Sequence, residues 1–141
     1  MSTPIKEQQI SFETAKLAQK KLFDWVCTTL YVMYNAVGTL RDCHYATTKN
    51  SDLDYGGIAA SCSQTILQKW LREIHRIEVT VYSNASGFHW TLDKSFNINW
   101  YSGGTHIADS SMSGPNNAGG WNAYEEAMEA GLFAALERLK V

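Results

Sequence analysis

The alternation of apolar and polar residues is clearest in the second half of the chain, where it first predicts a helix. Over Ser63–Arg76 the polar residues occupy one side and the apolar residues recur at helical spacing. The apolar positions are Ile66, Leu67, Trp70, Leu71 and Ile74. This spacing predicts an amphipathic helix, and Ser63 is the residue type preferred as its N-cap.

The period then changes to two, which predicts strands. Apolar and polar residues alternate in Ile77–Tyr82, Phe88–Leu92 and Phe96–Tyr101. Short turns separate these segments, so we expect an antiparallel meander. Thr105–Ala108 is a candidate for a short fourth strand. Ser110–Gly120 is rich in glycine and serine, and the sequence predicts a loop with little to hold it.

A second helix is predicted from Asn122 to the end of the chain. Asn122 and Glu125 have the spacing of a capping box, and Glu126 also suits the positive end of a helix. Arg138 and Lys140 are placed in the last turn, where cations are favourable. Its apolar stripe comprises Tyr124, Ala127, Met128, Gly131, Leu132, Ala135, Leu136 and Leu139.

The first part of the chain has a weaker pattern. Apolar residues at helical spacing predict a helix over Phe12–Asp24, with Ser11 as its N-cap. Trp25–Thr48 is rich in β-branched and aromatic residues, which predicts one or two strands with a turn. Lys49–Gly57 is polar and ends in two glycines, so it is the place where the chain would divide, if it divides.

These elements predict an α+β fold. We expect an antiparallel sheet of three to four strands with helices packed on one face, in the order α-β-β-β-α. Length favours a single domain over residues 1–141, with an N-terminal helix and strand extension at 1–57 and the core at 63–141.

Composition supports a folded, cytoplasmic protein of the host cell. The chain is 45% hydrophobic with a formal net charge of −2, which gives no overall field to attract nucleic acid or an anionic membrane. Met1–Gln9 lacks the apolar core of a signal peptide, and Val26–Tyr34 is too short to cross a bilayer. Cys27, Cys43 and Cys62 lack disulfide or metal spacing, so free buried thiols are expected.

Two segments carry a resemblance to a known group of proteins. Ser63–Glu73 and Trp121–Leu132 resemble paired signatures of small uncharacterised proteins of gut bacteriophages and related mobile elements. Ile10–Ala18 is similar to the N-terminus of the same proteins. The resemblance implies a phage or mobile-element source. It implies no activity, because that group has none assigned.

The order helix–three strands–helix also resembles a double-stranded RNA-binding domain. In that family lysines at the start of the last helix meet the phosphates, whereas this chain has Glu125 and Glu126 there. Carboxylates oppose the phosphate contacts that supply most of such affinity. Nucleic-acid binding stays an alternative, and it requires Lys16, Lys20, Lys21, Lys69, Arg72 and Arg76 to form one basic stripe.

Catalytic and metal motifs are weak. His89-Trp90-Thr91 is similar to one half of the paired motif of two-histidine phosphoesterases, but the second copy is missing. An acid–base pair of His89 and His106 would need both rings near one substrate atom. Cys43, His44, Cys62 and His75 lack the usual zinc spacing. We therefore expect no catalytic residues, no metal and no cofactor.

The predicted site is the polar face of the sheet. Trp90 and Trp100 fall on the apolar face and are expected in the core. The opposite face would form a polar and aromatic surface for a ligand or partner, over which the loop at 110–120 could close. The residues expected there are Tyr82, His89, Asn97, Asn99, Tyr101 and His106.

The sequence thus predicts a non-enzymatic accessory protein that binds a host protein or a small ligand. Counter-defence is one setting in which such phage proteins act. A sheet face rich in aromatics also favours a homo-oligomer. The alternatives are a protein that sequesters a small molecule or nucleotide, and a nucleic-acid-binding module.

Overall fold

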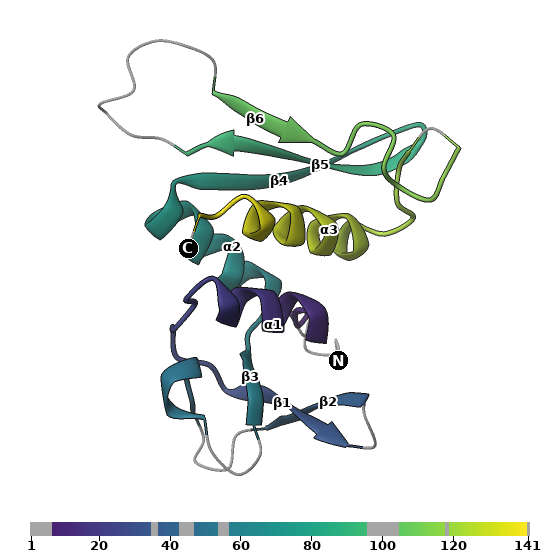
Figure 1. Cartoon of the computed structure of the whole chain (residues 1–141). Helices are drawn as coiled ribbons and strands as arrows, with labels where there is room; N and C mark the ends of the chain where they lie inside the picture. Colours follow the sequence, from purple (N-terminus) through teal and green to yellow (C-terminus); the bar gives the residue numbers. More distant parts are fainter. Residues whose placement is uncertain are drawn as a thin grey trace, which may run out of the picture. The chain divides into compact units, whose positions relative to one another are not determined.

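The computed structural model describes residues 7–34, 37–42, 47–53, 57–95, 105–117 and 119–140. Within these ranges the chain forms three α-helices and two antiparallel sheets of three strands each. This arrangement confirms the predicted α+β class (Figure 1). None of the described helices combines the length and the apolar character needed to cross a membrane.

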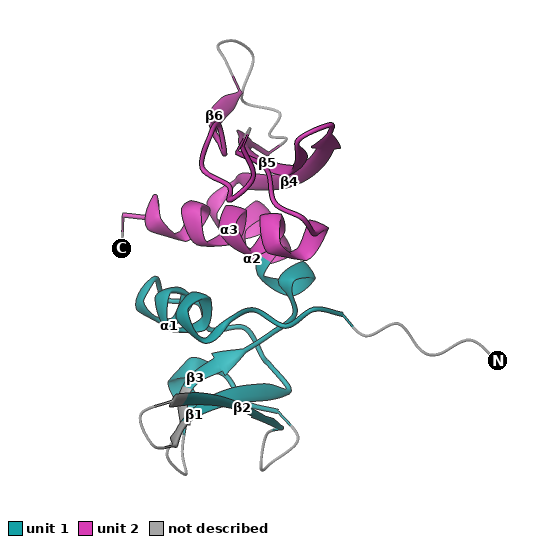
Figure 2. Ribbon diagram, turned by 90° about the vertical axis from the view of Figure 1, so that its right-hand side faces the viewer, with its two compact units in different colours: residues 1–67 teal, residues 68–141 magenta. Residues whose placement is uncertain are grey.

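Two compact units divide the chain, residues 1–67 and 68–141 (Figure 2). The boundary lies inside helix α2 (Gln64–His75), after the polar connection predicted at Lys49–Gly57. That connection includes the short 3-10 helix η1 (Asn50–Asp52), which belongs to the first unit. That the chain forms a single domain stays a prediction.

The first unit pairs helix α1 (Phe12–Lys20) with a sheet in the order β2-β1-β3. Its strands are β1 (Thr29–Tyr34), β2 (Val37–Asp42) and β3 (Gly57–Ser61). The helix prediction was four residues too long at its end. Leu22 has a φ of 70°, and this left-handed conformation takes the chain out of the helix.

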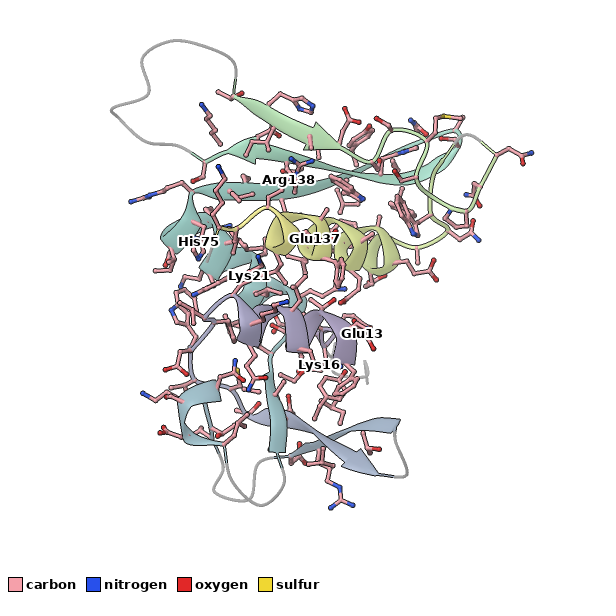
Figure 3. All side chains as sticks on the ribbon, viewed as in Figure 1. Glu13, Lys16, Lys21, His75, Glu137 and Arg138 are labelled. Atoms are coloured by element: carbon pink, nitrogen blue, oxygen red, sulfur yellow. The ribbon has the colours of Figure 1, made fainter. Side chains whose placement is uncertain are left out.

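Small residues let α1 approach its sheet closely. Ala15 and Ala18 are fully buried, and α1 packs chiefly against β3. A Cβ on Gly38 of β2 would lie 2.4 Å from Cγ of Phe12, so this ring requires a glycine beneath it. On the exposed side of α1, Nζ of Lys16 lies 4.9 Å from the centre of the Phe12 ring (Figure 3).

The second unit contains strands β4 (Ile77–Asn84), β5 (Gly87–Lys94) and β6 (His106–Asp109), and helix α3 (Tyr124–Glu137). With α2, the described elements follow the order α-β-β-β-α, and the sheet order is β4-β5-β6. The segment proposed as a short fourth strand is β6, which pairs with the edge of β5 opposite β4. The strand predicted at Phe96–Tyr101 lies outside the described residues.

Helix α3 covers the inner face of this sheet (Figure 1). Val79 and Leu92 are fully buried beneath it, and Trp90 is 7% exposed. A Cβ on Gly131 would lie 2.9 Å from Cβ of Trp90 and 3.0 Å from Cγ1 of Val79. Gly131 therefore sets how closely the helix approaches β4 and β5.

The predicted ends of α3 were wrong. Ala123 is the N-cap and its side chain forms no capping bond, so Asn122 and Glu125 make no capping box. The reason is the β-bridge between Phe88 and Trp121, which keeps the chain extended before the helix. Arg138 follows Glu137, the last helical residue, so no cation lies in the last turn (Figure 3).

Two residues of the predicted apolar stripes are solvent-exposed. Tyr124 at the start of α3 is 44% exposed, and Ile74 near the end of α2 is 55% exposed. The remaining stripe of α3 is buried as predicted, from Ala127 to Leu139.

Candidate functional site

Strand register places a set of polar and aromatic residues on the face of the second sheet opposite α3. Facing residues across β4 and β5 are Glu78 with Asp93, Thr80 with Thr91, and Tyr82 with His89. Asp109 and His106 of β6 face Thr91 and Asp93 respectively. Directly opposed residues share one face of a sheet. We call this set of eight residues the outer face: Glu78, Thr80, Tyr82, His89, Thr91, Asp93, His106 and Asp109.

Tyr82 and His89, two predicted site residues, lie in contact at one end of the outer face. Their rings stack with centroids 5.4 Å apart and planes 20° apart. Tyr82 is 46% exposed, whereas His89 is only 5% exposed. The expectation of a solvent-facing His89 was therefore wrong, because the Tyr82 ring and the residues after β6 cover it.

The His89 ring has hydrogen-bond partners at both nitrogens. Nε2 lies 2.8 Å from Oγ of Ser86 and 3.2 Å from Oδ1 of Asn84, and Nδ1 lies 3.2 Å from Oγ of Ser110. The Ser86 hydroxyl also donates to Asn84 Oδ1 at 2.7 Å. These contacts are mutually consistent when Nε2–H donates to Ser86 and Nδ1 accepts from Ser110.

With this tautomer His89 does not act as a base toward Ser86. Its Nδ1 accepts from Ser110, whose side chain is fully buried. A general base must accept the proton of the serine that it activates. Here the Ser86 proton is directed to Asn84, and His89 donates to Ser86. The contacts therefore support a positioning role for His89, which holds the ring of Tyr82 from below.

The loop at Ser110–Gly120 is held by hydrogen bonds, so the prediction that little holds it was wrong. Phe88 and Trp121 exchange both backbone bonds, at 2.8 and 2.9 Å. Asn116 Nδ2 donates to Ser86 O at 3.0 Å. The loop is thereby anchored to the β4–β5 hairpin, and its first residue, Ser110, is fully buried against His89.

A second cluster lies at the other end of the outer face, around His106. Its Nδ1 is 3.6 Å from Oδ1 of Asp93, and its Nε2 is 3.4 Å from Oδ2 of Asp109. Thr91 Oγ1 donates to Asp93 Oδ2 at 3.2 Å, and Ser111 Oγ donates to Asp109 Oδ1. The Ser111 hydroxyl is the main cause that lowers the pKa of Asp109, and nearby His106 adds to it.

The structure does not bring the two predicted histidines together. His106 faces Asp93, which is four residues along β5 from His89. At the rise of an extended strand this separation is about 13 Å. The two imidazoles therefore cannot act on one substrate atom as an acid–base pair.

The outer face is acidic at the His106 end. Glu78, Asp93 and Asp109 contribute carboxylates, and Arg72 Nη1 lies 3.5 Å from Oε1 of Glu78. Three carboxylates and one guanidinium make this end of the outer face acidic. Such a surface repels a phosphate backbone.

Several predicted residues cannot be placed on the outer face. Asn97, Asn99 and Tyr101 lie outside the described residues, as do Cys43 and His44. The carboxylates Asp93 and Asp109 and the hydroxyl of Ser110 were missed from the sequence. Asp93 continues the alternation of His89 and Thr91, which was a usable signal.

The remaining ligand-type side chains do not build a metal site among the described residues, which contain no group of three or more suited to one. Cys27 and Cys62 are buried thiols, as predicted. A hydrogen bond from Cys62 lowers the pKa of the Cys27 thiol. His75, labelled in Figure 3, packs edge-on against Trp70 with ring centroids 4.6 Å apart, and burial lowers its pKa.

Comparisons with known proteins add no relative. No family model, curated protein or solved structure matches the chain.

Proposed function

We propose that the protein is a non-enzymatic binding module of a phage or mobile element, and that the outer face contacts a host protein. The observation that carries the proposal is the arrangement of this face, with an exposed, supported tyrosine at one end and two held carboxylates at the other. The resemblance of Ser63–Glu73 and Trp121–Leu132 to phage proteins supports the source.

Tyr82 suits an anchoring contact. Tyr82 is 46% exposed, and its ring stacks on His89, which hydrogen bonds hold at both ring nitrogens. A ring that is already positioned loses little conformational entropy when a partner packs on it. Tyrosine is also among the residues that most often dominate binding energy in protein interfaces.

Asp93 and Asp109 suit a cationic group. Thr91 and Ser111 hold the two carboxylates, and His106 lies between them. An arginine of a partner can bind carboxylates through parallel hydrogen bonds and would replace the weaker contacts of the imidazole. We therefore propose that the partner presents a lysine or arginine at this end.

The spacing of the two ends favours a polypeptide over a small ligand. Tyr82 and Asp93 lie in rows that are four residues apart along the strands, or about 13 Å. An extended chain covers this distance in about four residues. The expected partner segment is extended, with an aromatic or apolar side chain and a basic one separated by three residues.

Fluorescence anisotropy with short labelled peptides tests the proposal. One peptide carries arginine and phenylalanine separated by three serines, its reverse tests the orientation, and a third replaces arginine by glutamate. We expect binding of at least one arginine peptide and none of the glutamate peptide. Asp93→Asn should weaken binding about fivefold, as expected for a partly exposed ion pair worth about 1 kcal/mol.

The matched control is Glu126→Gln, which removes an exposed carboxylate from α3, away from the outer face. It should leave the affinity unchanged. Equal losses in Asp93→Asn and Glu126→Gln would show that only overall charge matters. Binding of neither arginine peptide would reject the proposed recognition.

A further inference from the structure

The free edge of β4 is protected over only half of its length. Gln68 Nε2 donates to Val79 O at 2.6 Å, so the carbonyl of Val79 points away from β5. In an antiparallel pair alternate residues direct both backbone groups to the same edge. Val81 and Ser83 therefore direct their N–H and C=O groups outward as Val79 does, and no described residue pairs with them there.

Beyond Val79 the edge of β4 lacks the features that usually prevent a strand of another chain from pairing with it. Proteins protect sheet edges with short strands, bulges, prolines or charged side chains. The opposite edge uses two of these, because β6 has four residues and its pairing with β5 shifts register after Leu92. The β4 strand has eight residues in unbroken register, and Val79–Gly87 contains no charged residue and no proline.

We propose that a second copy of this chain pairs with β4 through Val81 and Ser83, in antiparallel orientation about a twofold axis at Tyr82. Val81 of each copy exchanges both backbone hydrogen bonds with Ser83 of the other. Tyr82 then faces Tyr82 of the second copy. The β4-β5-β6 sheet of one copy and the same sheet of the other then form one continuous sheet of six strands.

The register favours a second copy over an unrelated strand. Val81 and Ser83 are separated by one residue, and both direct their backbone groups outward. A twofold axis at Tyr82 places Val81 of each copy opposite Ser83 of the other, so every outward backbone group of these residues is hydrogen-bonded. It leaves the bond between Gln68 and Val79 intact. The opposed tyrosines form a pair without mutual hydrogen bonds, the close type in which aromatic side chains interact best.

The neighbouring pairs of the proposed interface are compatible as well. Thr80 faces Asn84 of the second copy, so no like charges oppose one another. Directly opposed residues lie on the same side of a sheet, and the outer faces of both copies therefore form one surface. The proposal depends on the backbone of β4 and stands without the proposed function.

Sedimentation equilibrium over a range of concentrations, with a charge exchange at the axis, tests the dimer. The wild-type protein should approach twice the chain mass of 15.8 kDa. Tyr82→Lys and Tyr82→Glu alone should each be monomeric, because like charges meet at the axis. An equimolar mixture of the two variants should recover the dimer, which also shows that both variants are folded.

Thr80→Lys is the matched control, since Thr80 is exposed on the same face but lies off the axis. It should remain dimeric. Ser83→Pro removes an outward N–H and should give a monomer, whereas Ser83→Ala should not. A wild-type monomer at every concentration overturns the proposal. A dimer that Tyr82→Lys leaves unchanged also overturns it, as does an unrecovered mixture of two folded variants.

Discussion

Alternate residues of the same strands form the two faces of the β4–β5–β6 sheet, and the two faces have different roles. On the inner face Trp90 and Leu92 are buried under α3. On the outer face Thr91 and Asp93 are half-buried and hydrogen-bonded to each other. The difference indicates that the inner face supplies stability, while the outer face holds polar groups in fixed positions, where the proposed partner would contact them. Substitutions one residue apart should separate these two roles.

The largest expected effect is on the inner face. Leu92→Ala removes a fully buried side chain and should lower the free energy of unfolding by about 2–5 kcal/mol. Thr91→Ala, the adjacent residue on the outer face, should lower it by about 0.5 kcal/mol or less. Urea unfolding followed by circular dichroism measures both. Equal losses would remove the distinction between the faces.

His89 is the exception on the outer face, because it is buried there. His89→Ala leaves the buried hydroxyl of Ser110 without its partner and should cost about 1–3 kcal/mol of stability. Tyr82→Ala removes the stacked ring alone, worth about 0.5–1.5 kcal/mol. An unchanged unfolding midpoint in His89→Ala would show that its hydrogen bonds do not stabilise the fold.

Gly131→Ala should lower the free energy of unfolding by a smaller amount, although helix propensity alone predicts an increase. Alanine is favoured over glycine in a helix by about 1 kcal/mol. The added Cβ would press on Trp90 and Val79, and overpacking costs about 1–3 kcal/mol. We expect Gly131→Ala to lower the free energy of unfolding by about 1 kcal/mol. A higher melting temperature would mean that α3 is free to move away from the sheet.

Sequence reasoning worked where a pattern is local. The alternation from Ile77 to Leu92 gave both strands and placed Tyr82 and His89 on one face. It missed β3 (Gly57–Ser61) because its small residues show no clear alternation. The prediction of Asn122 as the N-cap was wrong because the bridge between Phe88 and Trp121, which are 33 residues apart in the sequence, overrides the local preference.

The residues of the candidate site were also predicted where the pattern is local and missed where they depend on distant contacts. The sequence showed which residues of β4 and β5 share a face, since that depends on period alone. It could not show that β6 places Asp109 beside Thr91, or that Ser110 buries His89, because both depend on strand pairing across a long connection. Histidine exposure was misjudged for this reason.

The smallest expected effect is the pH dependence of Asp109. Its lowered pKa means that its contribution to stability is present above the ordinary carboxyl pKa and is lost as pH falls through the lowered value. Ser111→Ala should raise the pKa of Asp109 toward its ordinary value, and Ser113→Ala should not. Carbon-detected NMR of the carboxyl group measures both. No change in Ser111→Ala would contradict the hydrogen-bond assignment.

The most direct test of the division between the two faces is NMR of the labelled protein during titration with the arginine–phenylalanine peptide. Thr91 and Trp90 are neighbours on β5 that point to opposite faces. We predict that the methyl resonance of Thr91 shifts as peptide is added, while the indole N–H of Trp90 does not. Shifts of the Trp90 indole with an unchanged Thr91 methyl would contradict recognition by the outer face.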